Sequence, residues 1–106
     1  MTTFDDREQA FEAKFAHDEE LAFKAQARRD KLMGMWVADL LGLTGDDAQA
    51  YAKTVVMADL AEPGDEDVLG KLRSDLDAAG KNPGDAMLRA KLEELHSLAK
   101  RQLMTE

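Results

Sequence analysis

Glycine and proline divide this chain into four segments, and this punctuation constrains its fold more than any other feature of the sequence. The breakers gather at residues 42–45, 63–64 and 80–84. The segments between them are rich in Ala, Leu, Glu, Lys and Met and contain few β-branched residues, a composition that favours helix over strand. The sequence therefore predicts an all-α protein, a small four-helix bundle with short loops.

The first predicted helix is the longest. Thr3 can cap its start, with Asp6 three residues later as in a weak capping box. The pattern continues over residues 4–41, and Gly42 supplies a left-handed stop. We therefore predict a first helix over residues 4–41.

The other three helices have start and stop signals of their own. Thr44, followed three residues later by an acid, predicts the start of the second helix. The third begins at a run of acids from Asp65 and ends at Gly80, and the fourth begins at Asp85, a predicted cap. The apolar positions at helical spacing, expected in the core, are Val68, Leu69, Leu72 and Leu76 on the third helix and Leu88, Leu92, Leu95, Leu98, Ala99 and Leu103 on the fourth.

The first predicted helix is too long for the other three to cover. At 1.5 Å per residue, residues 4–41 would span about 57 Å, whereas a compact domain of this size has a radius of gyration of about 13 Å. We therefore divide the chain into an N-terminal interaction segment, residues 1–20, and a helical bundle, residues 21–106. Asp18 could also cap a new helix after it, so a hinge at Asp18 is an alternative to one straight helix.

All four phenylalanines lie within the first 23 residues. On a helix, Phe4, Phe11 and Phe15 would fall within about 40° of one another, and Phe23 would lie near the bundle edge. Either the segment folds back and these rings fill a gap in the core, or they are buried only in the groove of a partner. The length argument favours the partner.

Composition excludes several classes of function. The net charge of -8 argues against binding to nucleic acid or to an anionic membrane surface. The absence of cysteine suits a reducing compartment. Since no apolar run approaches the roughly 18 residues of a membrane span and the N-terminus does not look like a signal peptide, we expect a cytoplasmic protein that does not insert into the membrane.

No motif assembles a catalytic or metal site. The two histidines, His17 and His96, lie on different predicted helices and neither is paired with a nucleophile. The acids at residues 45–47 and 64–67 stand where helix N-termini favour negative charge, and they lack the alternation of a calcium loop. There is also no glycine-rich phosphate fingerprint. We therefore expect no enzyme activity, no catalytic residues and no metal.

A basic turn interrupts the acidic sequence. Residues 24–31 carry four bases against one acid, a local charge of +3. Such a turn could hold a phosphate, with Arg28 and Arg29 as the candidates. The alternative is that Lys24, Arg28 and Arg29 pair with neighbouring acids such as Glu20.

Two stretches carry a family resemblance: FDDREQAFEAKFAHDEELAFKAQARRDKLMGMW at residues 4–36 and TGDDAQAYAKTVVMADLAEPGDEDV at residues 44–68. They resemble the alphaproteobacterial zeta subunit, the inhibitor of the F-type ATP synthase. The resemblance implies a four-helix bundle that binds the catalytic head and blocks ATP hydrolysis with its N-terminal segment, at the inner membrane only through the synthase. The positions that match the family's N-terminal pattern, and are expected to bind the partner, are Phe4, Asp5, Asp6, Arg7, Glu8, Phe11, Glu12, Lys14 and Phe15.

The resemblance also implies a noncatalytic site for ADP or ATP, for which Arg28 and Arg29 are the basic candidates. The family's pattern has Asn after the two arginines, whereas this chain has Asp30, and a carboxylate there would weaken phosphate binding. A nucleotide-binding regulatory module is thus the alternative function. The two functions are compatible, because a nucleotide could bias a hinge near Asp18.

Overall fold

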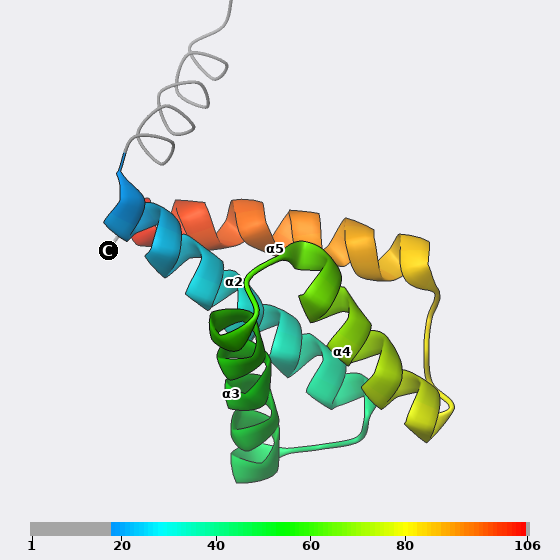
Figure 1. The fold of residues 1–106 in the computed structure, drawn as a ribbon. Coiled ribbons are helices and arrows are strands. Elements are labelled where there is room, and N and C mark those ends of the chain that lie inside the picture. Colours follow the sequence, from blue (N-terminus) through cyan, green and yellow to red (C-terminus); the bar gives the residue numbers. More distant parts are fainter. Residues whose placement is uncertain (1–17, 106) are drawn as a thin grey trace, which may run out of the picture.

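The computed structural model describes residues 18–105, which form four helices. These are α2 (Glu19–Leu40), α3 (Gly45–Ala61), α4 (Asp65–Ala79) and α5 (Asp85–Thr105), joined by short turns (Figure 1). The described part of the chain contains no strand, so the prediction of an all-α four-helix bundle is confirmed. None of the helices among residues 18–105 is long and apolar enough to cross a membrane.

The first described helix begins at Glu19. Asp18 has an extended backbone, with φ −113° and ψ 100°, and its Oδ1 accepts a hydrogen bond from the Leu21 amide at 3.1 Å. The expectation of one uninterrupted helix through Asp18 is therefore wrong, because the Asp18 side chain satisfies a free N–H of a new first turn. The alternative, a new helix capped by Asp18, is confirmed. The predicted start at Thr3 lies outside the described residues.

Two glycines end helices as predicted. Gly42 has φ 81°, and the Leu43 amide then donates to the Ala38 carbonyl at 2.9 Å. Gly80 has φ 69° and ends α4 in the same way, with the next amide donating to the Leu76 carbonyl at 2.9 Å. In both places the chain reverses through a left-handed residue, which costs little only at glycine.

Two predicted side-chain caps differ from the structure. Thr44 occupies the N-cap position of α3, but its hydroxyl makes no capping hydrogen bond. Asp85 is the first residue of α5, and its carboxylate instead accepts from Arg89 Nε at 2.7 Å and lies 3.2 Å from Arg73 Nε. Hydrogen bonds to charged guanidinium groups are stronger than those to neutral amides, which accounts for the choice at Asp85.

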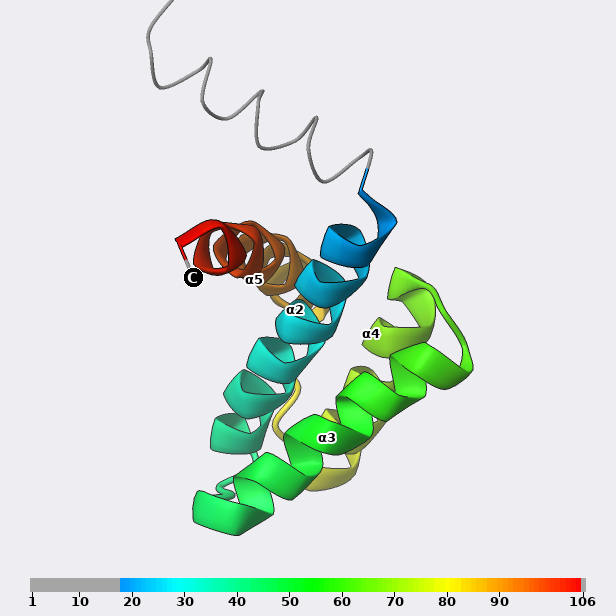
Figure 2. The ribbon, with the colours of Figure 1, turned by 90° about the vertical axis from the view of Figure 1, so that its left-hand side faces the viewer.

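Helix α2 lies in the centre of the fold, with α3 on one side and α5 on the other (Figure 2). The axes of α2 and α3 approach closely where Gly34 faces Ala52. A Cβ atom added at Gly34 would lie 2.6 Å from the Ala52 Cα atom, a distance that real Cβ atoms do not show. Small residues on both helices therefore set how near α3 can come to α2.

The core is aliphatic. Its buried cluster draws on all four helices and consists of Met33, Val37, Val55, Val68, Leu69, Leu72, Leu76, Leu88 and Leu92. The predicted core positions on α4 are all buried, whereas on α5 only Leu88, Leu92 and Ala99 are, with Leu98 exposed. The three aromatic residues of the described part stay outside the cluster: Trp36 and Tyr51 are half-buried at its edge and Phe23 is 56% exposed. The prediction that Phe23 lies at the bundle edge is confirmed.

Candidate functional site

The predicted site residues fall into two groups. The nine predicted partner-binding residues, Phe4 to Phe15, lie outside the described residues. Arg28 and Arg29 lie on α2, where Arg28 is half-buried and Arg29 is only 3% exposed. The structure therefore turns one of the two predicted phosphate-binding arginines inward.

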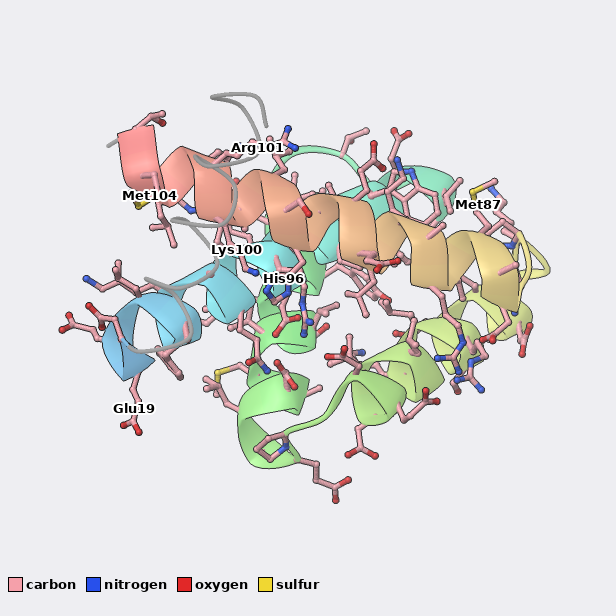
Figure 3. The ribbon with its side chains drawn as sticks, turned by 90° about the horizontal axis from the view of Figure 1, so that it is seen from above. Glu19, Met87, His96, Lys100, Arg101 and Met104 are labelled. Carbon is pink, nitrogen blue, oxygen red and sulfur yellow. The ribbon has the colours of Figure 1, made fainter. Side chains whose placement is uncertain are left out.

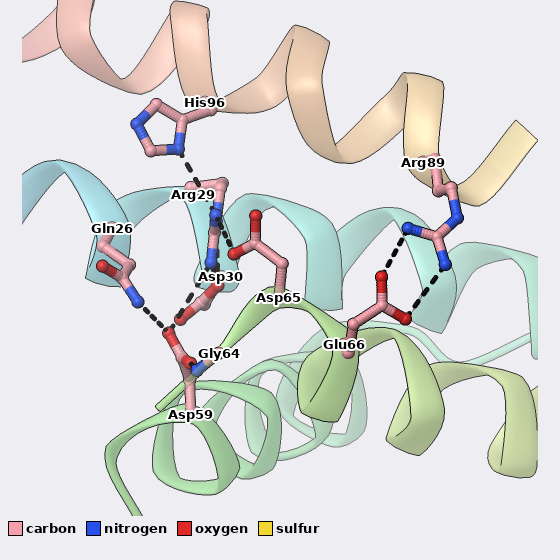
Figure 4. Close-up of polar contacts among 9 residues, drawn as sticks. All are labelled: Gln26, Arg29, Asp30, Asp59, Gly64, Asp65, Glu66, Arg89 and His96. Carbon is pink, nitrogen blue, oxygen red and sulfur yellow. Dashed lines mark hydrogen bonds and ion pairs between the residues drawn. The ribbon is translucent and has the colours of Figure 1, made fainter. Parts of the chain in front are cut away.

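Arg29 joins the helices around it through its guanidinium group (Figure 4). Its Nε and Nη2 atoms donate to Asp30 Oδ1 at 3.1 and 2.9 Å. Its Nη1 atom donates to Asp65 Oδ1 at 2.9 Å and lies 3.4 Å from His96 Nδ1. With Asp59 Oδ2 3.6 Å from Nη2, this one side chain contacts residues of α2, α3, α4 and α5.

Asp59 holds the end of α3 against both α2 and the next turn. Its Oδ2 accepts from Gln26 Nε2 at 2.7 Å, and its Oδ1 accepts from the Gly64 amide at 3.3 Å. Burial alone would raise the pKa of Asp59, but hydrogen bonds from Asp30, Gln26 and Gly64 outweigh burial and hold this pKa below its usual value. Asp59 is thus a buried carboxylate whose charge is stabilised by protein hydrogen bonds.

The pKa of Asp30 is shifted in the opposite direction to that of Asp59. Burial, followed by the hydrogen bond to Asp59, raises the pKa of Asp30 to about 8, even though Arg29 lowers it. Burial would lower the pKa of Arg29, but Asp30 and Asp65 more than compensate and raise it. The guanidinium is therefore charged at any working pH, while Asp30 can hold a proton near neutrality.

The alternative expectation for the basic turn, pairing with nearby acids, is confirmed for Lys24 and Arg29. Lys24 Nζ lies 3.1 Å from Glu20 Oε1, one helical turn away on the exposed face of α2. Arg29 pairs with its neighbour Asp30 and with the distant Asp59 and Asp65. A phosphate at Arg29 would have to displace these carboxylates.

A pocket of about 240 Å³ opens between α4 and α5 beside Arg29. Leu69 and Leu92 form its apolar lining, and its polar lining consists of Arg29, Asp65, Arg89, Glu93 and His96. His96 lies on the side of α5 that faces α2, whereas Arg101 points to the opposite side (Figure 3). The pocket offers guanidinium and imidazole groups to an anion, but its two carboxylates oppose one. Among residues 18–105, no three side chains of metal-binding type form a metal site.

Exposed ion pairs join α4 and α5 beside this pocket. Arg89 Nη1 and Nη2 donate to the two carboxylate oxygens of Glu66 at 2.6 and 3.0 Å (Figure 4). Arg73 lies 3.6 Å from the same carboxylate. Because a two-point guanidinium–carboxylate pair fixes both partners in one plane, it orients α5 on α4.

Three of the residues that contact Arg29 could not be predicted from the sequence. Asp59, Asp65 and His96 lie between 30 and 67 residues from Arg29 along the chain. Asp65 was expected only as a favourable charge at the start of a helix, and no signal assigned a role to Asp59. Their convergence depends on which helix faces meet, which a single sequence does not encode locally.

Comparisons with known proteins agree with this architecture. A search of curated proteins found no match. A protein whose structure was determined in solution by NMR is 58% identical to this chain and aligns with a TM-score of 0.70, over 78% of this chain and 94% of its own. The family model described as ATPase inhibitor subunit zeta matches residues 1–102. The chain therefore belongs to the family of ATPase inhibitor subunit zeta.

Proposed function

We propose that this protein inhibits ATP hydrolysis by the F-type ATP synthase through insertion of its N-terminal segment into the catalytic head. Membership of an ATPase inhibitor family makes it a regulatory subunit associated with ATP synthase. The observation that supports this proposal is that a helix capped by Asp18 begins a bundle with a buried aliphatic core of its own. The chain would act in the cytoplasm, reaching the inner membrane only through the synthase.

The proposed contact surface is the N-terminal set of nine residues. Phe4, Phe11 and Phe15 are its apolar anchors, each contributing about 1.5–3 kcal/mol if fully buried in the partner. The charged residues would set register and partner choice more than affinity. They are Asp5, Asp6, Arg7, Glu8, Glu12 and Lys14. In this proposal the N-terminal segment inserts between moving subunits and stops their rotation mechanically. The inhibitor therefore needs no catalytic chemistry of its own.

The anchors can be tested by replacing all three phenylalanines with alanine in the full chain. The wild type and the triple variant are titrated against the purified catalytic head while ATP hydrolysis is followed. We expect the half-inhibitory concentration to rise at least about a thousandfold. This is the loss of affinity that follows if each of the three phenylalanines contributes the lower value of about 1.5 kcal/mol to binding.

The matched control is Phe23→Ala, because Phe23 is exposed on α2 and belongs to the described bundle. This variant should inhibit within about threefold of wild type, the scatter of a surface substitution. A triple variant that inhibits as well as Phe23→Ala would refute the proposed contact surface.

Regulatory binding of ADP or ATP is the second candidate, and the pocket between α4 and α5 favours it. Its guanidinium groups could bind phosphate, while the adjoining Leu69 and Leu92 provide apolar surface for a base. Asp65 and Glu93 oppose a polyphosphate. Arg28, predicted from the sequence, is the neighbour of Arg29 on α2 but does not line the pocket.

The nucleotide hypothesis is decided by titrating ADP into the full chain while recording Trp36 fluorescence and backbone amide shifts. Arg28→Ala and Arg89→Ala are the informative variants, because neither removes the buried Arg29. Saturable shifts that disappear in Arg89→Ala place the nucleotide in the pocket, and loss in Arg28→Ala places it at the basic turn. No saturable shift up to millimolar ADP removes the hypothesis.

A further inference from the structure

Two buried carboxyl groups face one buried guanidinium group at the centre of this fold. Asp30 on α2 is 1% exposed and Asp59 on α3 is 5% exposed. The Nη2 atom of Arg29 lies 2.9 Å from Asp30 Oδ1 and 3.6 Å from Asp59 Oδ2. One buried cation cannot neutralise two buried carboxylates, and an uncompensated buried charge is costly. The cluster is therefore neutral only if one carboxyl keeps its proton.

The hydrogen-bond partners indicate which group that is. Asp30 and Asp59 lie within hydrogen-bonding reach of each other, and a hydrogen bond between two carboxyl groups needs a proton on one of them. Both donors from Arg29 to Asp30 use Oδ1, which leaves Oδ2 to carry the proton. Asp59 already accepts from Gln26 and from the Gly64 amide, as an ionised carboxylate does. Asp30 thus donates and Asp59 accepts.

We propose that Asp30 and Asp59 share one proton, and that this proton makes the docking of α3 and of the turn at Gly64 onto α2 sensitive to alkaline pH. Losing the proton places two negative charges side by side where a hydrogen bond had joined the helices. Because Asp59 holds both Gln26 of α2 and the Gly64 amide, repulsion there loosens the contact between α2, α3 and the start of α4.

The groups facing the pair come from every helix. Arg29 and Gln26 face it from α2 and the Gly64 amide from the turn after α3. Asp65 at the start of α4 and His96 on α5 reach it through Arg29. His96 is another titratable side chain that contacts Arg29, so its replacement serves as a control.

The direction of the pH effect follows from the pKa of Asp30. This pKa is raised from 3.8 to about 8 in the folded chain, chiefly by burial. Between these values the folded protein holds one more proton than the unfolded chain, so each pH unit upward raises the unfolding equilibrium constant by up to tenfold. The stabilisation from the bound proton is complete below about pH 4 and is lost as pH rises to about 8. The lowered pKa of Asp59 acts with the opposite sign, at acid pH outside this window.

The direct test is a carboxyl-carbon NMR titration of the full wild-type chain from pH 4 to 9. We expect Asp30 to titrate with a midpoint near 8 and Asp59 to stay ionised throughout. Assignment is checked with Asp30→Asn, which removes one of the two signals. If both carboxyl groups ionise below pH 5, the proposal is overturned.

The stability consequence is tested by urea unfolding between pH 5 and pH 8.5. Asp30→Asn keeps a hydrogen-bond donor towards Asp59 but has no proton to lose. In wild type the unfolding equilibrium constant should rise by up to tenfold per pH unit, and in Asp30→Asn most of this rise should be absent. His96→Asn and the exposed Asp39→Asn on the same helix as Asp30 are the controls and should retain the wild-type slope.

A full wild-type slope in Asp30→Asn would overturn the proposal, as would loss of that slope in His96→Asn alone. If Asp30→Asn does not fold, the carboxyl titration of the wild-type chain decides the question by itself.

Discussion

Arg29 connects all four described helices through its guanidinium group. Its sequence context, a basic turn in an acidic chain, indicates an exposed anion site. The structure places it inside, where its donors meet Asp30 and Asp65 and its Nη2 atom also lies near Asp59. A buried guanidinium with several carboxylate partners serves the specificity of helix docking, because no apolar residue could satisfy the same set of acids.

Replacing Arg29 with methionine should therefore destabilise the protein. The substitution keeps much of the side-chain volume but leaves Asp59 ionised and buried without its cation. We expect a loss of about 3–5 kcal/mol in the free energy of unfolding at pH 7, measured by urea denaturation. Lys31→Met, at an exposed position two residues along α2, should change it by less than about 0.5 kcal/mol. Equal denaturation midpoints for the two variants would contradict the assigned role of Arg29.

At the scale of the elements, most helix ends could be predicted from the sequence because they depend on local chemistry. Gly42 and Gly80 stop helices through their own backbone conformation, which needs no tertiary partner. The error at Asp18 arose from the same locality: a continuous apolar pattern favoured one long helix, whereas the Asp18 side chain caps a new one. Asp85 differs from its predicted role for another reason, because its carboxylate pairs with Arg89 one turn along α5 and with Arg73 on α4.

The packing of α2 on α3 could not be predicted, although it depends on one glycine. Gly34→Ala would force a Cβ atom into the Ala52 backbone and push the helices apart. We expect a loss of about 1–3 kcal/mol in the free energy of unfolding, despite the higher helix propensity of alanine.

Gly70→Ala is the matched comparison for Gly34→Ala. Gly70 is also inside a helix, and a Cβ atom there would meet nothing within 4 Å. Alanine should therefore stabilise the protein by about 0.5–1 kcal/mol. Thermal or urea unfolding of both variants checks the pair, and a Gly34→Ala variant as stable as Gly70→Ala would show that the close approach is relaxed in solution.

At the scale of the whole molecule, residues 18–105 form one four-helix bundle. The fold class could be predicted from helix-forming composition and breakers, and the family from the two matching stretches. The central place of α2 and the convergence around Arg29 could not, because they depend on contacts between segments far apart in the sequence. The aliphatic core explains the uneven use of phenylalanine, since the aromatic residues among residues 18–105 stay at its edge or outside it.

The most direct test of the proposed function compares the full chain with a variant that begins at residue 18. Because the Asp18 cap and the core cluster remain, the truncated protein should keep its helical circular dichroism and cooperative thermal unfolding. Both proteins are titrated against the isolated catalytic head of the ATP synthase while ATP hydrolysis is measured. We predict that the full chain inhibits hydrolysis and that the folded, truncated bundle does not; undiminished inhibition by the truncated bundle would contradict the account.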